Sequence, residues 1–182
     1  MPSYAAFLRA INLGAVRRFA NPEIVAATEA AGCTDVVARG GTGNVRLTSP
    51  RRSVAGVAAD LERAYLADRG FAVPTVVLTL PELVDVVAVG EGLAAERPWA
   101  DRHSVTLLAV MPDADLAADA EALSGDQGDV VVRGRAVHLF SRTVADGGPV
   151  GGAVGGDGVE RRLGTGTNRT HRVLADLAAR WA

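Results

Sequence analysis

The sequence predicts an α+β protein built from two ferredoxin-like halves, each a split βαβ unit with an antiparallel sheet, the second ending in an extra helix. Its 182 residues, of which 48% are hydrophobic, suffice for one large domain or two small ones. Residues 1–80 follow the order strand, helix, strand, strand, helix, strand, and the second half begins that order again. We therefore expect subdomains at 1–80 and 103–182, joined by a helix and connection over 81–102.

In the first half, strands are predicted where short apolar or β-branched runs lie between turn residues: 4–9, 34–39, 44–48 and 73–78. Asn21 before Pro22 and Glu23 predicts an N-cap and a first-turn proline for a helix that reaches residue 31. A second helix is predicted to open at Ser49-Pro50 and to end near Gly70, because its apolar residues recur three and four positions apart.

In the second half, strands are predicted at 103–111, 130–133 and 136–140, the last two joined by a hairpin at Gly134-Arg135. Helices are predicted at 79–89, 112–123, 159–163 and 169–181. The last strand of the split βαβ plan is thus expected to be replaced by helix. The segment 147–158 holds seven glycines in twelve residues and is expected to be a mobile loop.

The residue types present exclude several chemistries. All 19 basic residues are arginine, so Schiff-base mechanisms and Walker-type phosphate loops are excluded, and any anion must be bound by guanidinium or backbone N–H groups. The three histidines, His103, His138 and His171, are far apart and form no metal-binding motif, so we expect structural or surface roles for them, with no metal and no cofactor. Cys33, the single cysteine, follows a helix end and is expected to serve packing.

Two observations concern location. No apolar run approaches the roughly 20 residues that cross a bilayer, so we expect no membrane partner. The first ten residues show no basic region followed by a small-residue cleavage site, which favours a cytoplasmic protein.

One strand end carries the candidate site. Arg9 follows the apolar strand at 4–8 and precedes a loop that holds Asn12 and Gly14. The first strand of a split βαβ unit lies centrally, so Arg9 would emerge at a central strand end, where it could bind a phosphate or carboxylate together with Asn12 and nearby N–H groups. The turn at Gly43-Asn44 is explained by its need for positive φ.

Four stretches in order resemble a bacterial family catalogued only as domain of unknown function 1697. Residues 7–14 resemble its F-L-R-G-I-N-V-G opening, and residues 42–51, 134–139 and 160–165 resemble its later motifs. The resemblance implies two associated ferredoxin-like subdomains and no established activity. We take as candidate ligand-binding residues the positions that keep the family pattern, closely in the first half and loosely in the second: Arg9, Asn12, Gly14, Gly43, Asn44, Thr165, Asn168 and Thr170. Ala10 and Ala15 replace glycines of the family's first loop.

Three functions remain open. The first is binding of a small anionic ligand at the end of the first strand, with an enzymatic step left open. The second is a non-catalytic protein-interaction module, with self-association into a homo-oligomer as one form. The third is nucleic-acid binding through the arginine doublets, against which the formal net charge of −2 argues.

Overall fold

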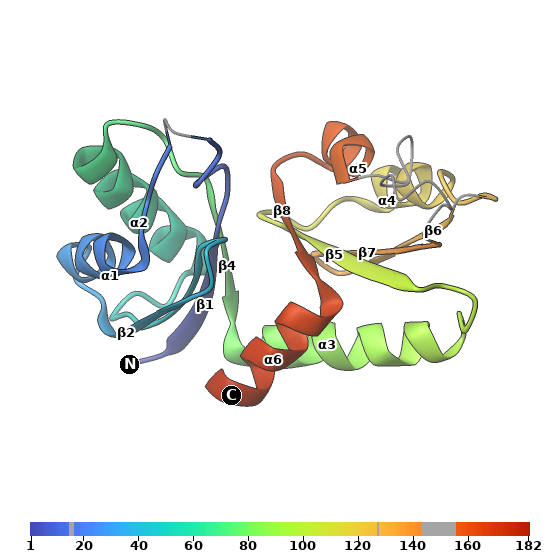
Figure 1. Ribbon diagram of the computed structural model, residues 1–182, viewed down its shortest axis with the longest axis horizontal. Coiled ribbons are helices and arrows are strands. Elements are labelled where there is room, and N and C mark those ends of the chain that lie inside the picture. The colour runs from blue at the N-terminus through green and yellow to red at the C-terminus, as the bar shows by residue number, and fades with distance from the viewer. Residues whose placement is uncertain (15–16, 127, 143–155) are drawn as a thin grey trace. The chain divides into compact units, whose positions relative to one another are not determined.

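The computed structural model describes residues 1–14, 17–126, 128–142 and 156–182. These form two compact units: unit 1 is Met1–Leu83 with Trp181, and unit 2 is Val84–Arg180 with Ala182. Each unit contains one four-stranded antiparallel sheet with helices packed against it (Figure 1). The predicted α+β class and the two split βαβ halves are therefore confirmed. The part of the glycine-rich segment at 147–155, like Ala15, lies outside the described residues.

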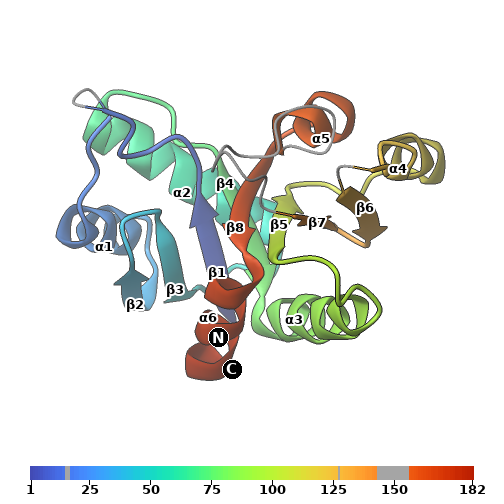
Figure 2. The ribbon, with the colours of Figure 1, turned by 45° about the vertical axis from the view of Figure 1, so that its right-hand side comes forward.

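Unit 1 follows the predicted order of elements. These are β1 (Ser3–Leu8), α1 (Asn21–Ala30), β2 (Thr34–Arg39), β3 (Asn44–Thr48), α2 (Val54–Arg69) and β4 (Thr75–Thr79). The strand order is β2-β3-β1-β4, so β1 is an interior strand paired antiparallel on both sides. Figure 2 shows α1 and α2 on the same face of this sheet.

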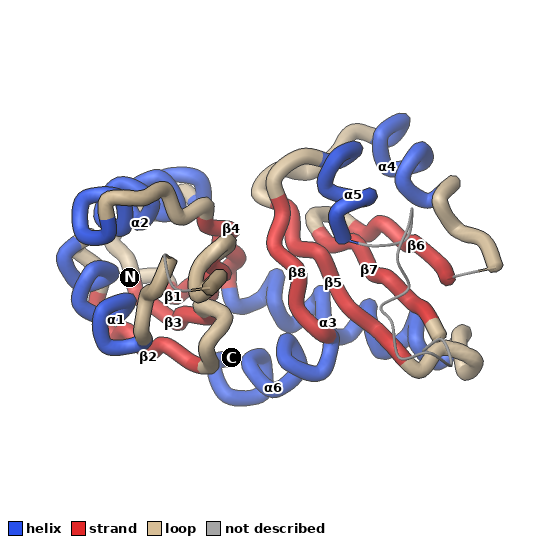
Figure 3. The backbone as a smooth tube through the Cα atoms, turned by 45° about the horizontal axis from the view of Figure 1, so that its top comes forward, coloured by secondary structure: helices blue, strands red, loops and turns tan. Residues whose placement is uncertain are grey.

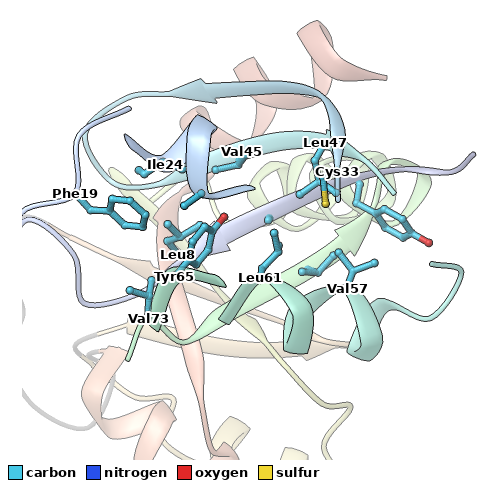
Figure 4. Close-up of a cluster of buried hydrophobic side chains, with 14 of the residues drawn as sticks. Leu8, Phe19, Ile24, Cys33, Val45, Leu47, Val57, Leu61, Tyr65 and Val73 are labelled. Carbon is cyan, nitrogen blue, oxygen red and sulfur yellow. The ribbon is translucent and has the colours of Figure 1, made fainter. Parts of the chain in front are cut away.

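The core of unit 1 lies between that sheet face and the two helices (Figure 4). Alternate residues of β1, among them Tyr4 and Leu8, point into it because successive side chains of a strand face opposite sides. The ring of Tyr65 from α2 meets Phe19 edge to face, with centroids 5.3 Å apart. The Tyr65 hydroxyl is paired with the Thr28 hydroxyl at 2.8 Å, so neither buried hydroxyl lacks a partner.

Two helix starts differ from prediction. The N-cap of α1 is Ala20 rather than Asn21, and the Glu23 carboxylate accepts a hydrogen bond from the Ala20 N–H at 2.8 Å in place of a capping side chain. Helix α2 begins at Val54 with Ser53 as its N-cap. The predicted start at Ser49 is wrong because the Ser49 hydroxyl instead accepts from the N–H two residues on, which makes a turn before the helix.

Unit 2 contains α3 (Leu80–Ala95) from Val84 onward. The elements that follow are β5 (Arg102–Leu108), α4 (Ala114–Glu121), β6 (Gly128–Arg133), β7 (Ala136–Ser141), α5 (Gly156–Leu163), β8 (Gly166–Thr170) and α6 (His171–Trp181). The strand order is β6-β7-β5-β8. Helices α4 and α5 cover one face of this sheet and α3 covers the other (Figure 3). In the described part of the chain, no helix is both long enough and apolar enough to cross a membrane.

The fourth strand of unit 2 corrects a prediction. Residues 166–170 form β8, which pairs with β5 from Leu108↔Gly166 to Ser104↔Thr170, so helix does not replace the last strand. The sequence GTNRT contains no apolar run, and the strand forms because its ladder with β5 supplies the hydrogen bonds. Thr170 then serves as the N-cap of α6, accepting from the Val173 N–H at 3.4 Å.

One of the two outer strands of unit 1, β2, is irregular. Strand β2 pairs only with β3, and its register shifts between Thr34 and Val37. Asp35 within this shift has a φ of +51°, a conformation that few residues other than glycine and asparagine adopt readily.

Candidate functional site

Three segments of unit 1 meet where β1 ends. The first is the β1 loop, defined as residues 9–14 and 17–19; the others are the β2–β3 turn at 40–43 and the α2–β4 connection at 70–74. The Leu8 N–H donates to the Gly43 carbonyl at 2.8 Å, and the Arg9 N–H donates to the Pro74 carbonyl at 2.9 Å. The end of the interior strand is therefore fixed to both neighbouring segments, as expected for Arg9.

Asn12 fastens the β1 loop. Its Oδ1 accepts from the Phe19 N–H at 3.0 Å, and its Nδ2 donates to the Gly41 carbonyl at 2.7 Å and to the Phe19 carbonyl at 3.3 Å. Its own N–H donates to the Arg17 carbonyl at 2.7 Å. The side chain of Asn12 thus joins the loop to the β2–β3 turn, and its direct contact with a ligand stays a prediction.

The backbone of the β1 loop holds three left-handed residues at alternate positions. Ala10, Asn12 and Gly14 have φ values of +56°, +55° and +65°. A non-glycine residue in this region costs about 1–3 kcal/mol and persists only where the surroundings impose it. Positive φ at alternate residues is one feature of the backbone nests that bind anions, although the N–H of Asn12 itself is engaged by the Arg17 carbonyl.

Packing and hydrogen bonds explain why glycine and asparagine occupy positions 43 and 44 at the β2–β3 turn. A Cβ on Gly43 would lie 2.6 Å from the Leu8 Cβ and 2.8 Å from the Ile11 Cδ1, so no other residue fits this position. The buried Asn44 amide donates to the Arg39 carbonyl and to the Thr42 hydroxyl, both at 3.2 Å. These contacts agree with the turn role predicted for Gly43 and Asn44, and they shape the site.

The three converging segments carry positive charge only. Residues 9–19, 40–43 and 70–74 contain no aspartate or glutamate and three arginines: Arg9, Arg17 and Arg18. Arg9 and Arg17 are half-buried, whereas Arg18 is exposed. The same segments contain no histidine, cysteine or serine. The arrangement is therefore suited to binding an anion and supplies no nucleophile or general base of those types.

Arg17 makes more contacts at the site than its position in the Arg17-Arg18 doublet led us to expect. Its Nη2 donates to the Ala72 carbonyl, and its guanidinium lies 4.8 Å from the centroid of the Phe71 ring. Its Nε–H is buried and has no hydrogen-bond partner within the described ranges. Buried donors are normally satisfied by protein, water or an ion, so this nitrogen marks a place where a ligand oxygen would be favoured.

The carboxylates at the margin of the site are already engaged. Glu23 forms an ion pair with Arg69 at 2.8 Å, and Glu62 accepts from the Thr75 N–H at 2.8 Å. The Ala20 N–H, and after it Arg69, holds the pKa of Glu23 below its usual value. These acids therefore do little to neutralise the arginines of the three segments.

The other predicted site residues lie in unit 2, and each has a structural contact there. The Thr165 carbonyl accepts from the Ala109 N–H at 3.2 Å. The Asn168 amide donates to the Thr106 hydroxyl at 3.0 Å and to the Ser104 hydroxyl at 3.4 Å. Thr170 caps α6. Any contact of these residues with a ligand stays a prediction.

The structure gathers side chains that sequence reasoning had kept apart. His103, His138 and His171 come together on the face of the unit 2 sheet that α3 covers. His103 stacks on His171 and is tilted by 41° against His138, and no group of three metal-ligating side chains suited to an ion is found among the described residues. No spacing in the sequence signals this cluster, because the pairing of β5 with β7 and the start of α6 create it.

The order of elements, the β1 loop and the β2–β3 turn are what the resemblance led us to expect, and residues 1–138 match the family described as "Protein of unknown function (DUF1697)". The chain belongs to this family. A solved structure of the conserved bacterial protein SP0830 from Streptococcus pneumoniae has a similar fold, with a TM-score of 0.74 at 17% identity. That match covers 100% of this chain and 98% of the other. No curated protein matches.

Proposed function

We propose that unit 1 binds a small anionic ligand, bearing a phosphate or carboxylate group, at the end of β1. One observation carries the proposal: the three segments that meet there carry three arginines, Arg9, Arg17 and Arg18, and no carboxylate. Like charges repel one another, so a bound anion is favoured where several arginines lie close together. Guanidinium groups bind phosphate and carboxylate oxygens through paired hydrogen bonds, which suits both ligand types.

The contacts that hold the β1 loop without a ligand support this proposal. Asn12 ties it to the Gly41 carbonyl, and the apolar side chains of Ile11 and Phe19 anchor it in the core. A binding loop that is already ordered loses little conformational entropy on binding, which leaves more of the interaction energy for affinity. The strained backbone at Ala10 and Asn12 is the kind of feature that collects at ligand-binding sites.

A thermal-shift experiment tests the proposal. Wild type, Arg9→Gln and Arg18→Gln would be screened against inorganic phosphate, nucleotides, sugar phosphates and citrate. A ligand at about one hundred times its dissociation constant adds about 2.7 kcal/mol, which raises the Tm of a chain of this size by several degrees. We expect such a rise with at least one phosphate- or carboxylate-bearing compound, and its loss in both variants.

Arg180→Gln is the matched control. Arg180 is an exposed arginine of α6 in unit 2 and pairs with Asp176 at 2.8 Å, so its loss removes the same charge far along the sequence from the β1 loop. It should leave the ligand-induced shift unchanged. A folded wild type that responds to none of the compounds, or a shift that all three variants lose equally, would overturn the proposal.

A second candidate function, protein interaction, is favoured by one observation in unit 2. The connection between β5 and α4 exposes Val110 at 74% and Met111 at 61%, and Leu116 on α4 is 40% exposed. Contiguous exposed apolar side chains mark protein-interaction sites more often than isolated ones do. Light scattering at several concentrations, with Met111→Ser as the variant, tests self-association: a wild type that stays monomeric at every concentration contradicts it.

A further inference from the structure

The aromatic rings beneath α3 in unit 2 form a continuous column. The ring of His103, on β5, stacks on His171 with centroids 4.3 Å apart and an interplanar angle of 10°. Its ring also stacks on Phe140 of β7 at 4.1 Å, and the guanidinium of Arg97, in the connection after α3, lies 5.0 Å from the Phe140 centroid. The stacked rings therefore come from three elements, β5, β7 and α6.

His138 lies beside this column and is fully buried. Its Nδ1 is hydrogen-bonded to the Nε2 of His103 at 3.1 Å, and its Nε2 has no partner in the described part of the chain. His171 donates through its Nε2 to the Val87 carbonyl at 3.1 Å, which ties the first residue of α6 to α3. The two helices are thus held to the sheet and to each other through imidazoles.

Helix α3 approaches the rings closely at one point. A Cβ on Gly90 would lie 2.5 Å from the Cδ2 and Nε2 of His171 and 3.1 Å from the Cε1 of His103. The rings therefore fill the space under the helix, and a change in the column must be transmitted to α3.

The charged groups around the column are mostly cationic. Arg97 faces it from the connection after α3, and Arg133 acts on it from β6. Arg169 of β8 lies on the same sheet face, since it and His138 are both register partners of Val105. β7 contributes no charged residue, and Arg102 of β5 precedes His103 and so faces the opposite side of the sheet.

Carboxylates near the column are used elsewhere. Asp129 of β6 binds Arg97 at 2.8 Å, and Glu96, directly after α3, pairs with the same guanidinium at 3.4 Å. Neither acid is among the groups that shift the pKa of His103 or His138. The cations that disfavour protonation of these two imidazoles are therefore not offset by either acid.

Both histidines resist protonation as long as the column is packed. Burial, followed by the neighbouring His171 and His138 and by Arg97, lowers the pKa of His103 to about 3. Burial, followed by His171, Arg133 and Arg97, lowers the pKa of His138 to about 4. At neutral pH the imidazoles of His103 and His138 are thus uncharged.

We propose that the histidine column is an acid-sensitive latch that releases α3 and the first turn of α6 from the sheet of unit 2 when its imidazoles become protonated. A released imidazole takes up a proton at its ordinary pKa of about 6.5, whereas a packed one does so only near 3 to 4. The packed state therefore keeps its full stability above about pH 6.5 and loses it progressively as the pH falls toward 4. Each such imidazole favours release by about tenfold per pH unit in that range.

Hydrogen exchange measured by peptide mass spectrometry tests the latch, and unit 1 serves as the reference within the same sample. Unit 1 contains no histidine between residues 1 and 83, so its sheet should keep its protection in the same samples. After correction for intrinsic exchange, we expect protection of 84–95 and of 171–176 to fall by about tenfold or more between pH 6.5 and pH 5. Protection in unit 2 that is independent of pH, or that falls equally in both units, would overturn the proposal.

The double variant His103→Phe/His138→Phe keeps a ring at both positions and removes both titrating groups. It should flatten the pH dependence of protection in α3 and α6 while leaving unit 1 unaltered. Should it fail to fold, the imidazole C2–H resonances of the wild type give a separate answer. Two of the three must remain neutral until unit 2 opens; ordinary titration of all three near pH 6.5 in a folded protein would contradict the latch.

Discussion

The two units end their interior strands in the same way. In unit 1 the Leu8 N–H donates to the Gly43 carbonyl and the Arg9 N–H to the Pro74 carbonyl. In unit 2 the Leu108 N–H donates to the Arg135 carbonyl at 2.8 Å, and the next N–H, that of Ala109, donates to the Thr165 carbonyl at 3.2 Å. The registers also agree, because Phe7↔Asn44 and Leu107↔Ala136 open equivalent ladders.

The side chains placed on this shared backbone are different. The strand end of unit 1 carries Arg9, where unit 2 carries Ala109, and unit 2 closes its hairpin with two residues where unit 1 uses four. Unit 2 in turn holds all three histidines, which unit 1 lacks. The comparison teaches that the split βαβ plan decides where a strand end lies, whereas the residues on it decide what that end can bind.

Glycine substitutions in the turns after β2 and β6 should show the largest difference in stability between the two units. Gly43→Ala places a Cβ against Leu8 and Ile11 at a φ of +72°, so it should lower the free energy of unfolding by about 3 kcal/mol or more. Gly134→Ala, at a φ of +58° with open space around it, should cost only about 1 kcal/mol. Urea denaturation of both variants measures the difference, and equal costs would contradict the packing argument.

The two glycines of α3 form a matched pair in unit 2. Gly90→Ala forces a Cβ against the His171 ring and should destabilise by about 2 kcal/mol, because the stacked imidazole has to move. A Cβ on Gly92 meets nothing within 4 Å, so Gly92→Ala should stabilise the helix by up to about 1 kcal/mol. Thermal denaturation near neutral pH compares them. A stabilising Gly90→Ala would show that the column leaves room beneath α3.

Substitutions at Asn12 distinguish the effect of loop order on ligand binding in unit 1 from the effect of charge. Asn12→Asp keeps an acceptor for the Phe19 N–H but loses the donor to the Gly41 carbonyl, and it should cost about 1–2 kcal/mol. Its added negative charge beside the arginines should also weaken ligand-induced stabilisation. Asn12→Ser is the uncharged comparison, and calorimetry measures ligand binding by both variants. If neither Asn12→Asp nor Asn12→Ser lowers ligand affinity, the β1 loop is not part of the binding site.

The smallest effect is expected at Ala10. Its φ of +56° is one that glycine adopts without strain, so Ala10→Gly should stabilise unit 1 by about 1 kcal/mol or less. Chemical denaturation measures the gain, and Ala5→Gly in β1 serves as the control that should destabilise. A loss of stability in Ala10→Gly would indicate that the Cβ of residue 10 makes a packing contact worth more than the strain.

Much of the fold could be predicted from local patterns. Apolar alternation and turn residues located the first seven strands, and Asp113 and Thr79 were correctly placed at helix starts, where they now accept from the N–H groups of Leu116 and Glu82. Strand β8 could not be predicted because its residues are polar and its ladder with β5 is formed by residues distant in sequence. Helix α3 extends to Ala95 past its glycines because Leu93 packs on the sheet.

The candidate site was predicted in part. Arg9 at an interior strand end follows from fold topology, and the structure places Asn12, Gly43 and Asn44 beside it. The role of Arg17 was missed, since its stacking on Phe71 depends on a connection more than fifty residues later. The histidine column was missed for the same reason: only tertiary structure brings its three members together.

The irregular outer strand of unit 1 bears on how this protein behaves at high concentration. A flat, regular edge strand offers its unpaired N–H and C=O groups to any other extended chain, which makes it a starting point for aggregation. In β2 the register shift and the left-handed Asp35 interrupt that row of groups, and the carboxylate adds a charge at the same place. A second copy could pair with this edge of the sheet only by straightening β2, so the irregularity opposes edge-to-edge association on the β2 side.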